Sequence, residues 1–487
     1  MSPLLVFSVI TAYFALLIFI SWLTGKKSDT SSFFTANKQS PWYLVAFGMI
    51  GASLSGVTFI SVPGWVAESK FYYFQMVLGY LAGYFVIATV LMPVYYRLNL
   101  VSIYTYLEKR FGTHSYKTGS AFFLLSRVIG ASFRLFLVAG VLQIGFFNAF
   151  NIPFYITVAV TISLIWVYTF RAGIKTIVWT DTLQTLFMLA AVIITVLIIG
   201  KNLNLDFNDI ISVIKNSEYS EMFNTDWKSE SNFFKQFIAG AFIAIVMTGL
   251  DQDMMQKNLT CKNLKDAKKN MFWFSITLIP VNLIFLSLGV LLYFYAERSG
   301  IKIPDKPDDL FPLLALNHLS VFAGIVFLLG ITAAAFSSAD SALTALTTAF
   351  SIDFLKLNIN NPDKKTEKTK RLVHIGFSFL IFTVILLFSS INDKSVVSAV
   401  FKVAGYTYGP ILGLFAFGLM TKRKVKDKIV PFIAVISPIT AYFINMYSEK
   451  LFFGYKFGFE LLLVNGFLMF IGLFIFSEKE IPKVHPK

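Results

Sequence analysis

Residues 331–350, ITAAAFSSADSALTALTTAF, have the composition of a membrane helix but carry a cluster of oxygen-bearing side chains. Successive helical residues turn by about 100°, and this spacing gathers onto one arc Ala334, Ser337, Asp340, Ser341 and Thr344, with Ser338 at its edge. Small residues and hydroxyls often serve only helix packing, but a carboxylate at the centre of a membrane helix costs about 2.5–3.5 kcal/mol and is rarely kept without a partner or a task. Hydroxyl, carbonyl and carboxylate oxygens together suit a hard alkali cation. The segment therefore predicts an ion site inside a membrane protein.

The composition of the whole chain supports this class. Of its 487 residues 56% are hydrophobic and 14% are charged, whereas soluble proteins carry about 25% charged residues. Long apolar runs recur throughout, and they predict an all-α polytopic membrane protein, because helices satisfy their own backbone hydrogen bonds in lipid. We expect a single integral membrane domain over residues 1–487 with about thirteen transmembrane helices, at 4–24, 43–65, 73–97, 119–147, 153–170, 176–200, 234–256, 270–297, 320–350, 372–391, 396–421, 429–447 and 455–477.

The net charge of +15 is explained by membrane topology rather than by nucleic acid. With the N-terminus outside and the C-terminus in the cytoplasm, most of the 42 Lys and Arg residues fall in the inner loops, as the positive-inside rule requires. We therefore expect a multi-pass protein of an inner (cytoplasmic) membrane. Its expected surroundings are the lipid bilayer, with no nucleic acid and no obligate protein partner.

The sequence offers little for enzyme chemistry. Its single cysteine, Cys261, excludes an intrachain disulfide and a cysteine-rich metal site. The four histidines lie near predicted loops or helix ends. We therefore predict that the protein is not an enzyme.

Two polar segments separate the predicted spans. Residues 201–233 form a long outer loop of mixed charge, in which we expect one short helix. Residues 257–269, KNLTCKNLKDAKK, are either a basic amphipathic helix along the inner membrane surface or a plain solvated loop.

Two predicted spans are interrupted by glycine and polar residues. The second span contains GMIGASLSGVT (48–58), and the seventh contains IAGAFIAIVMTGLDQD (238–253). Interruptions at matching places in two halves of a membrane protein indicate an inverted-repeat transporter, whose substrate and ions bind where the helices unwind.

Three further charged residues lie within or beside the predicted spans, and two of them, Asp181 and Arg134, admit two interpretations each. Asp181 either starts a helix, where the helix dipole favours a carboxylate, or adds a charge to the cation cluster if its span packs against 320–350. Arg127, near the inner side, is expected to extend its charge to the membrane surface. Arg134 is about two turns deeper, where it pairs with an internal acid or binds an anionic substrate through its planar fork.

Two tyrosines, Tyr406 and Tyr408, flank a kink predicted at Gly409-Pro410. They either pack in the ordinary way or contact a polar ligand.

Five motifs then resemble a known family. They are SIYTYLEKRFG (102–112), IKTIVWTDTLQ (174–184), GLDQDMMQKNL (249–259), AAAFSSADS (333–341) and GYTYGPILGLF (405–415). Together they look like the sodium/solute symporter family, with some likeness to its bacterial sialic acid transporters. The resemblance implies a five-plus-five inverted-repeat (LeuT-type) core over 43–421, a leading helix at 4–24 and two trailing helices within 429–477.

The resemblance also implies site residues. The family's common sodium site matches Gly51, Leu54, Ala334, Ser337 and Ser338. A second sodium, present in some members, matches Asp181, Ser337, Asp340 and Ser341, although those members have serine where this chain has Asp340. The expected substrate zone matches Ser55, Thr58, Tyr73, Gln75, Arg134, Thr248 and Tyr406.

We therefore expect a sodium-coupled symporter that imports a small polar organic solute by alternating access. The solute is a sugar, sialic acid or another sugar acid or carboxylate, and one or two Na⁺ serve as coupling ions. The alternatives are a proton-coupled symporter of the same fold and a sodium symporter for an amino acid or a vitamin. Asp340 either strengthens the second sodium site or replaces one sodium by a protonatable group.

Overall fold

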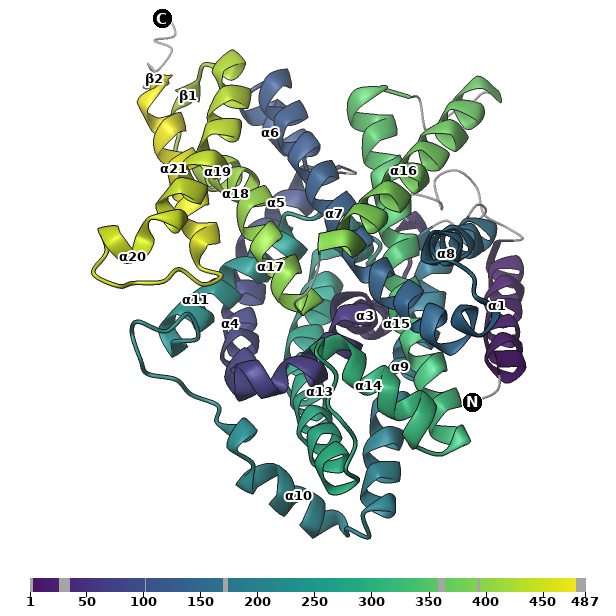
Figure 1. Ribbon diagram of the computed structural model, residues 1–487. Coiled ribbons are helices and arrows are strands. Elements are labelled where there is room, and N and C mark those ends of the chain that lie inside the picture. The colour runs from purple at the N-terminus through teal and green to yellow at the C-terminus, as the bar shows by residue number, and fades with distance from the viewer. Residues whose placement is uncertain are drawn as a thin grey trace, which may run out of the picture.

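The computed structural model describes residues 3–25, 36–100, 102–169, 174–357, 364–391 and 395–478. Within these ranges the chain is almost entirely helical, with one short antiparallel pair of strands near the C-terminus (Figure 1). The predicted all-α class is confirmed for this part of the chain.

The elements of the first half follow the predicted spans closely. They are α1 (Pro3–Gly25), η1 (Ala36–Lys38), α3 (Trp42–Ser69), η2 (Lys70–Tyr72), α4 (Tyr73–Val86), η3 (Ile87–Leu91), α5 (Met92–Arg97), α6 (Thr105–Arg110), α7 (Thr113–Gly145), η4 (Phe147–Phe150), α8 (Phe154–Thr169), α9 (Ile174–Asn202), α10 (Phe207–Asn216) and η5 (Glu218–Ser220).

The second half begins with a helix that ends in a π-helical turn. Its elements are α11 (Phe233–Ala244), η6 (Ile245–Gly249), α12 (Gln252–Asn258), α13 (Leu264–Arg298), η7 (Pro307–Asp309), α14 (Leu310–Leu313), η8 (Leu314–His318), α15 (Val321–Ala349), η9 (Phe350–Phe354), α16 (Lys364–Ile391), α17 (Val396–Thr407), α18 (Gly409–Met420), β1 (Lys424–Val425), η10 (Asp427–Ile429), α19 (Val430–Met446), α20 (Ser448–Leu451), α21 (Leu461–Ile475) and β2 (Ser477–Glu478).

Many of these helices can cross a membrane. In the described ranges seven stretches are long and apolar enough, or up to nine if each of two bent helix pairs is one span. Three shorter apolar helices accompany them, Leu4–Ile20, Phe154–Trp166 and Leu461–Ile475. One of the seven stretches, Trp42–Arg97, contains both α3 and α4. The count of thirteen spans stays a prediction.

Helix α15 lies in the interior of the bundle. All its residues from 330 to 349 are buried, and 78% of its most apolar window is buried, against 17% for α16. It packs against α9, α3 and α7, whereas α1 lies at one edge of the molecule and α21 at the opposite edge (Figure 1). The oxygen-bearing arc of α15 therefore faces protein and not lipid.

Both predicted interruptions are confirmed. In α3, Ser55 has φ 53° and ψ 176°, which is not helical. In the seventh predicted span, the pair 233–249 and 252–258 is bent by 71° after Gly249. Carbonyl groups of the turn before each break lose their usual helical partners, so that they can bind other groups. The kink predicted at Gly409-Pro410 is also present, as a 48° bend between α17 and α18.

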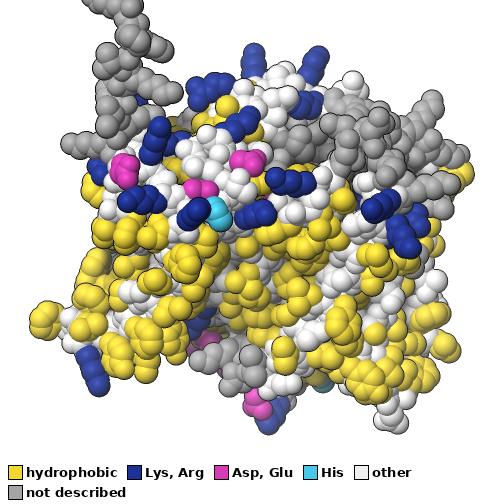
Figure 2. Space-filling model, turned by 90° about the horizontal axis from the view of Figure 1, so that it is seen from above, with side chains coloured by type: hydrophobic (Ala, Val, Ile, Leu, Met, Phe, Trp, Pro, Cys, Tyr) yellow, Lys and Arg dark blue, Asp and Glu magenta, His cyan; other side chains and the backbone are white. Residues whose placement is uncertain are grey.

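The surface has the distribution expected of a membrane protein. Figure 2 shows hydrophobic side chains over a broad band, with Lys and Arg gathered mostly along one margin of this band. Large apolar side chains are exposed on the peripheral helices, among them Phe379 on α16 and Phe432 on α19. Such side chains gain nothing from water and fit contact with lipid.

The prediction for one of the two polar segments is confirmed, and the prediction for the other is wrong. The loop 201–233 holds the expected short helix, α10, whose N-terminus is closed by reciprocal hydrogen bonds between Asp206 and Asp209. Residues 257–269 are neither one surface helix nor a solvated loop, because α12 ends at Asn258 and α13 begins at Leu264. Lys257 itself is buried, with 1% of its surface exposed.

Helices α4 and α11 approach each other at glycine. A Cβ atom added to Gly79 would lie 2.0 Å from the carbonyl oxygen of Phe237, and one added to Gly240 would lie 2.1 Å from that of Met76. Small residues at such positions let membrane helices pack backbone to backbone. This contact fixes α11, and with it the break that follows.

We predict that Gly240→Ala lowers the stability of the folded protein by about 1–3 kcal/mol, since the methyl group has no room against the Met76 backbone. The melting temperature of the detergent-purified protein measures the effect. Gly140→Ala is the matched control, because a Cβ there meets nothing within 4 Å. Equal melting temperatures for the two variants would contradict the close contact.

Candidate functional site

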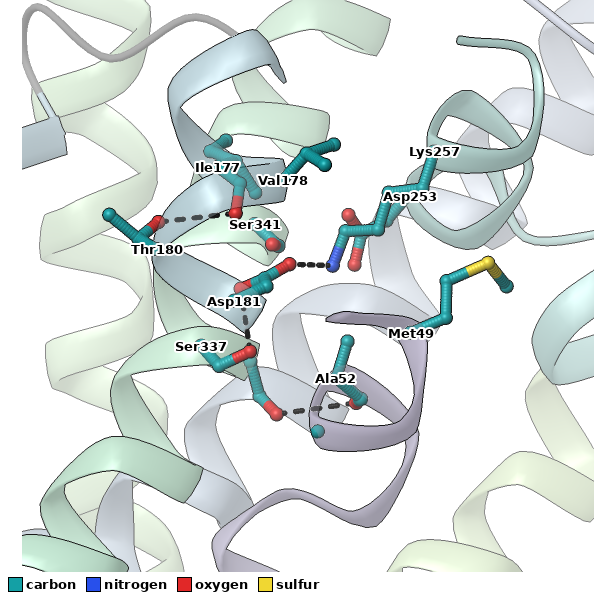
Figure 3. A network of polar contacts seen from close by, with 12 residues as sticks. Met49, Ala52, Ile177, Val178, Thr180, Asp181, Asp253, Lys257, Ser337 and Ser341 are labelled. Carbon is teal, nitrogen blue, oxygen red and sulfur yellow. Dashed lines mark hydrogen bonds and ion pairs between the residues drawn. The ribbon is translucent and has the colours of Figure 1, made fainter. Parts of the chain in front are cut away.

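A carboxylate and a hydroxyl meet where α9 packs against α15. Ser337 Oγ donates to Asp181 Oδ1 at 2.7 Å, and both side chains are fully buried (Figure 3). Asp181 lies about two turns inside α9, which begins at Ile174. The interpretation of Asp181 as a helix-start carboxylate is therefore wrong, and the predicted packing of its span against 320–350 is confirmed.

The second oxygen of this carboxylate meets a lysine. Lys257 extends from the last turn of α12, and its Nζ lies 2.8 Å from Asp181 Oδ2 (Figure 3). Asp253 and Asp340 add further attraction to the ammonium group. A lysine is almost never fully buried unless it is paired, so this ion pair explains how Lys257 is accommodated.

The remaining residues of the expected second sodium site lie on the same part of α15. Asp340 and Ser341 are buried, and an Asp340 carboxylate oxygen accepts the backbone N–H of Ser341. Within the described ranges the Ser341 hydroxyl has no hydrogen-bond partner. Figure 3 places Ser341 beside the Asp181–Lys257 pair. The four residues of the expected site are thus brought together, with an ammonium group among them.

The expected common sodium site lies between α15 and the break in α3. Ser338 Oγ lies 3.4 Å from the carbonyl oxygen of Ala52 and 3.4 Å from that of Ala334. Gly51 is held against α9, because its backbone N–H donates to Thr185 Oγ1 at 3.1 Å. Leu54 directly precedes the break at Ser55.

These residues fit a sodium ion. The Ser55 break frees carbonyl groups on α3, and α15 presents two buried hydroxyls and the Ala334 carbonyl to the same place. Neutral oxygen atoms of this kind are the ligands that a hard cation prefers. The buried ammonium of Lys257 contacts Asp181.

A cavity begins at the same break. About 80 Å³ of it is accessible to the centre of a water-sized sphere, so the cavity is narrow. Five of the expected substrate residues line it: Ser55, Thr58, Tyr73, Arg134 and Thr248. Other lining residues are mostly apolar or aromatic, and they include Tyr80, Tyr84, Asn282 and Phe401.

The two arginines of α7 have different environments. Arg127 is buried and forms ion pairs with Asp253 and, at 3.7 Å, with Asp251, so the expectation that it extends to the membrane surface is wrong. Arg134 is also buried, yet it makes no ion pair in the described part of the chain, and its Nε has no hydrogen-bond partner there. Since Arg134 lines the cavity, its guanidinium is available to a ligand.

Two expected substrate residues do not line the cavity. The Gln75 side chain holds the loop 201–233, donating to the Ser231 carbonyl at 2.9 Å and accepting the Asn224 N–H at 3.1 Å. Tyr406 points elsewhere, and its hydroxyl accepts a hydrogen bond from Asn445 Nδ2 at 3.1 Å. Tyr408, the other tyrosine at the predicted kink, donates to Asp251 Oδ2 at 2.8 Å.

The sequence interpretation missed several residues at the broken seventh span. Tyr95 and Tyr104 donate to the backbone carbonyls of Gly249 and Leu250, each at 2.8 Å, and so hold the unwound segment. Lys257 and Asp253 were also missed. The motif GLDQDMMQKNL (249–259) was the available signal, because it places two acids and a lysine directly after an interrupted helix.

Broken helices that surround a polar cavity at an ion site define a secondary transporter. The sodium:solute symporter family model matches residues 33–427, and the chain belongs to this family. It is accordingly a sodium-coupled solute symporter and not an enzyme, and the alternative of proton coupling is set aside.

Individual relatives are distant. The chain is 23% identical to the sodium/sialic acid symporter NanT of Aliivibrio fischeri, over 82% of this chain and 80% of the relative. It is also 23% identical to the sodium/sialic acid symporter SiaT of Proteus mirabilis, over 88% of each. The solved substrate-bound, outward-open state of a Na⁺-coupled sialic acid symporter superposes with a TM-score of 0.80 at 18% identity, over 97% of this chain and 99% of that one. This likeness confirms the inverted-repeat transporter fold.

We predict that Gly51→Ala weakens sodium binding at least ~10-fold, a loss of about 1.4 kcal/mol or more. The added Cβ would lie 2.2 Å from Thr185 Oγ1, so α3 must move away from α9 where its carbonyls are needed. Equilibrium binding of ²²Na⁺ to the purified protein measures the change. Gly376→Ala on α16 is the control, because its Cβ meets nothing within 4 Å. Unchanged ²²Na⁺ affinity in Gly51→Ala would contradict a site at this break.

Proposed function

We propose that the solute is a small organic anion rich in hydroxyl groups, such as sialic acid or another sugar acid. The observation that carries this proposal is the guanidinium of Arg134, which is buried at the wall of the cavity and forms no ion pair with any of the described residues. A buried cation without a partner is costly, and a carboxylate with two oxygens matches the guanidinium fork. The hydroxyls of Ser55, Thr58 and Tyr73 supply further donors and acceptors for a polyhydroxylated ligand. Two relatives named as sialic acid symporters support the same class.

We propose further that one sodium binds at Gly51, Leu54, Ala334, Ser337 and Ser338. These ligands come from α3 and α15, so sodium holds the two helices in one relative position. The solute contacts the same break in α3 from the cavity side, through Ser55 and Thr58. Ion and solute each bind better when the break has one geometry, and this shared preference couples their transport.

The proposed location is the inner membrane of a bacterium, with the N-terminus outside and the C-terminus in the cytoplasm. The support is the excess of basic residues on the loops assigned to the inner side and the gathering of Lys and Arg along one margin of the apolar band.

The solute assignment predicts a specific effect of Arg134→Ala. Sodium-driven uptake of sialic acid into proteoliposomes should require at least ~10-fold more sialic acid for half-maximal rate, because a hydrogen bond to a charged group is worth about 1.5–3 kcal/mol. Arg134→Lys should recover only part of the loss, since lysine keeps the charge but not the fork. Lys402→Ala, which removes an exposed cation, is the control. Unchanged affinity in Arg134→Ala would contradict an anionic solute and leave sodium coupling intact.

The orientation is tested by labelling introduced cysteines. The single native cysteine, Cys261, is buried and should not compete for the label. Asn216→Cys at the end of α10 and Lys268→Cys in α13 are both at exposed positions. A membrane-impermeant maleimide added to intact cells should label Asn216→Cys and leave Lys268→Cys unlabelled until the cells are opened. The reverse pattern would place the N-terminus inside.

A further inference from the structure

The buried ion pair between Lys257 and Asp181 is not explained by helix packing. Lys257 has 1% of its surface exposed, Asp181 has 0%, and their charged atoms are 2.8 Å apart. Replacing such a pair by apolar residues is often neutral or stabilising, so its presence is weak evidence for a stabilising role. The pair lies at the residues that the family resemblance assigned to a second sodium (Figure 3).

We propose that the Lys257 ammonium is a built-in cation that fills the second cation position, so that this chain binds one sodium and not two. The inference rests on the proposed sodium sites and deepens them, because it sets the number of coupling ions.

The first argument is that both carboxylate oxygens of Asp181 are already occupied. Asp181 Oδ1 accepts the Ser337 hydroxyl, and Oδ2 contacts Lys257 Nζ. Both oxygens therefore have a partner from the protein itself. A sodium ion at this carboxylate would have to displace the ammonium or share its oxygen.

The second argument is repulsion. Two positive charges 4 Å apart repel by about 4 kcal/mol at the effective dielectric constant of about 20 that describes protein sites. That energy corresponds to roughly a thousandfold loss of affinity for a second cation.

Asp340 is the counter-argument, because it adds a carboxylate that attracts cations. It lies near enough to attract the Lys257 ammonium, while Asp253 is paired with Arg127. The carboxylate of Asp340 offsets the charge of the Lys257 ammonium, which gives Asp340 a task beside Lys257. Asp340 offsets part of the repulsion from Lys257, so the exclusion of a second cation depends also on the occupied oxygens of Asp181.

A built-in cation changes the transport cycle. Sodium is released with the solute, whereas the Lys257 ammonium stays covalently attached to α12. It therefore links α12, the second part of the broken seventh span, to α9 whether or not an ion is bound. Each sodium that crosses the membrane adds about 2.3 kcal/mol of driving force per 100 mV. A symporter that carries one sodium lacks the driving force that a second sodium would add.

The experiment counts bound sodium. Saturation binding of ²²Na⁺ to the full-length purified protein should give one ion per chain, and Ser338→Ala should abolish it. Lys257→Met removes the ammonium but keeps a side chain of similar length, and it should raise the count to two. The double variant Asp181→Asn/Lys257→Met should return it to one. Lys265→Met is the control, because Lys265 is an exposed lysine in the same basic segment and its loss should leave one ion.

Two ions bound to the wild-type protein would overturn the inference, and so would one ion bound to a folded Lys257→Met. If Lys257→Met does not fold, the wild-type count still decides. Absence of any ²²Na⁺ binding to the wild type would instead contradict the proposed sodium sites themselves, so the two failures are distinguishable.

Discussion

The Asp181 carboxylate joins three helices inside the membrane, and its buried charge constrains how these helices can be arranged. It accepts the Ser337 hydroxyl from α15 and pairs with the Lys257 ammonium from α12, while α9 carries it. An unpaired charge in lipid-embedded protein costs several kcal/mol. The three helices must therefore stay close enough for the charges of Asp181 and Lys257 to neutralise each other. This requirement brings the broken seventh span to the same place as the break in α3.

Helix breaks and close packing depend on each other in this fold. The Ser55 break removes backbone hydrogen bonds, a loss that lipid cannot repair. Protein groups hold the segments on which the breaks lie: Thr185 accepts the Gly51 N–H one turn before the first break, and Tyr95 and Tyr104 donate to carbonyls at the second break. Glycine at the contact between α4 and α11 lets the backbones approach closely enough for this. The irregular segments can exist because the regular helices around them are tightly packed.

Much of the fold was predictable because membrane helices follow from local composition. The apolar runs, both interruptions and the oxygen-bearing arc of α15 were visible in single segments. Residues whose role depends on packing between segments were not. Lys257 stands in a run of five lysines that resembles a surface segment, and only the position of α12 shows that it is buried. Tyr406 and Tyr408 are two residues apart just before the bend at Gly409, and the bend decides in which direction each side chain points. Only the structure shows that Tyr408 contacts Asp251 and that Tyr406 contacts Asn445. Gln75 is two residues from Tyr73, which puts the two side chains on different faces of α4.

Ser337 connects the two cation positions. Its hydroxyl has one O–H group, which donates a hydrogen bond to Asp181. The oxygen lone pairs are then left for the proposed common sodium position beside Ser338, so the hydrogen bond orients a proposed sodium ligand as well as satisfying a carboxylate. A change in the pairing of Asp181 with Lys257 therefore alters the hydroxyl that faces the common site. The buried ammonium and the proposed sodium thus act on one shared serine, and the charge state of one site affects the geometry of the other.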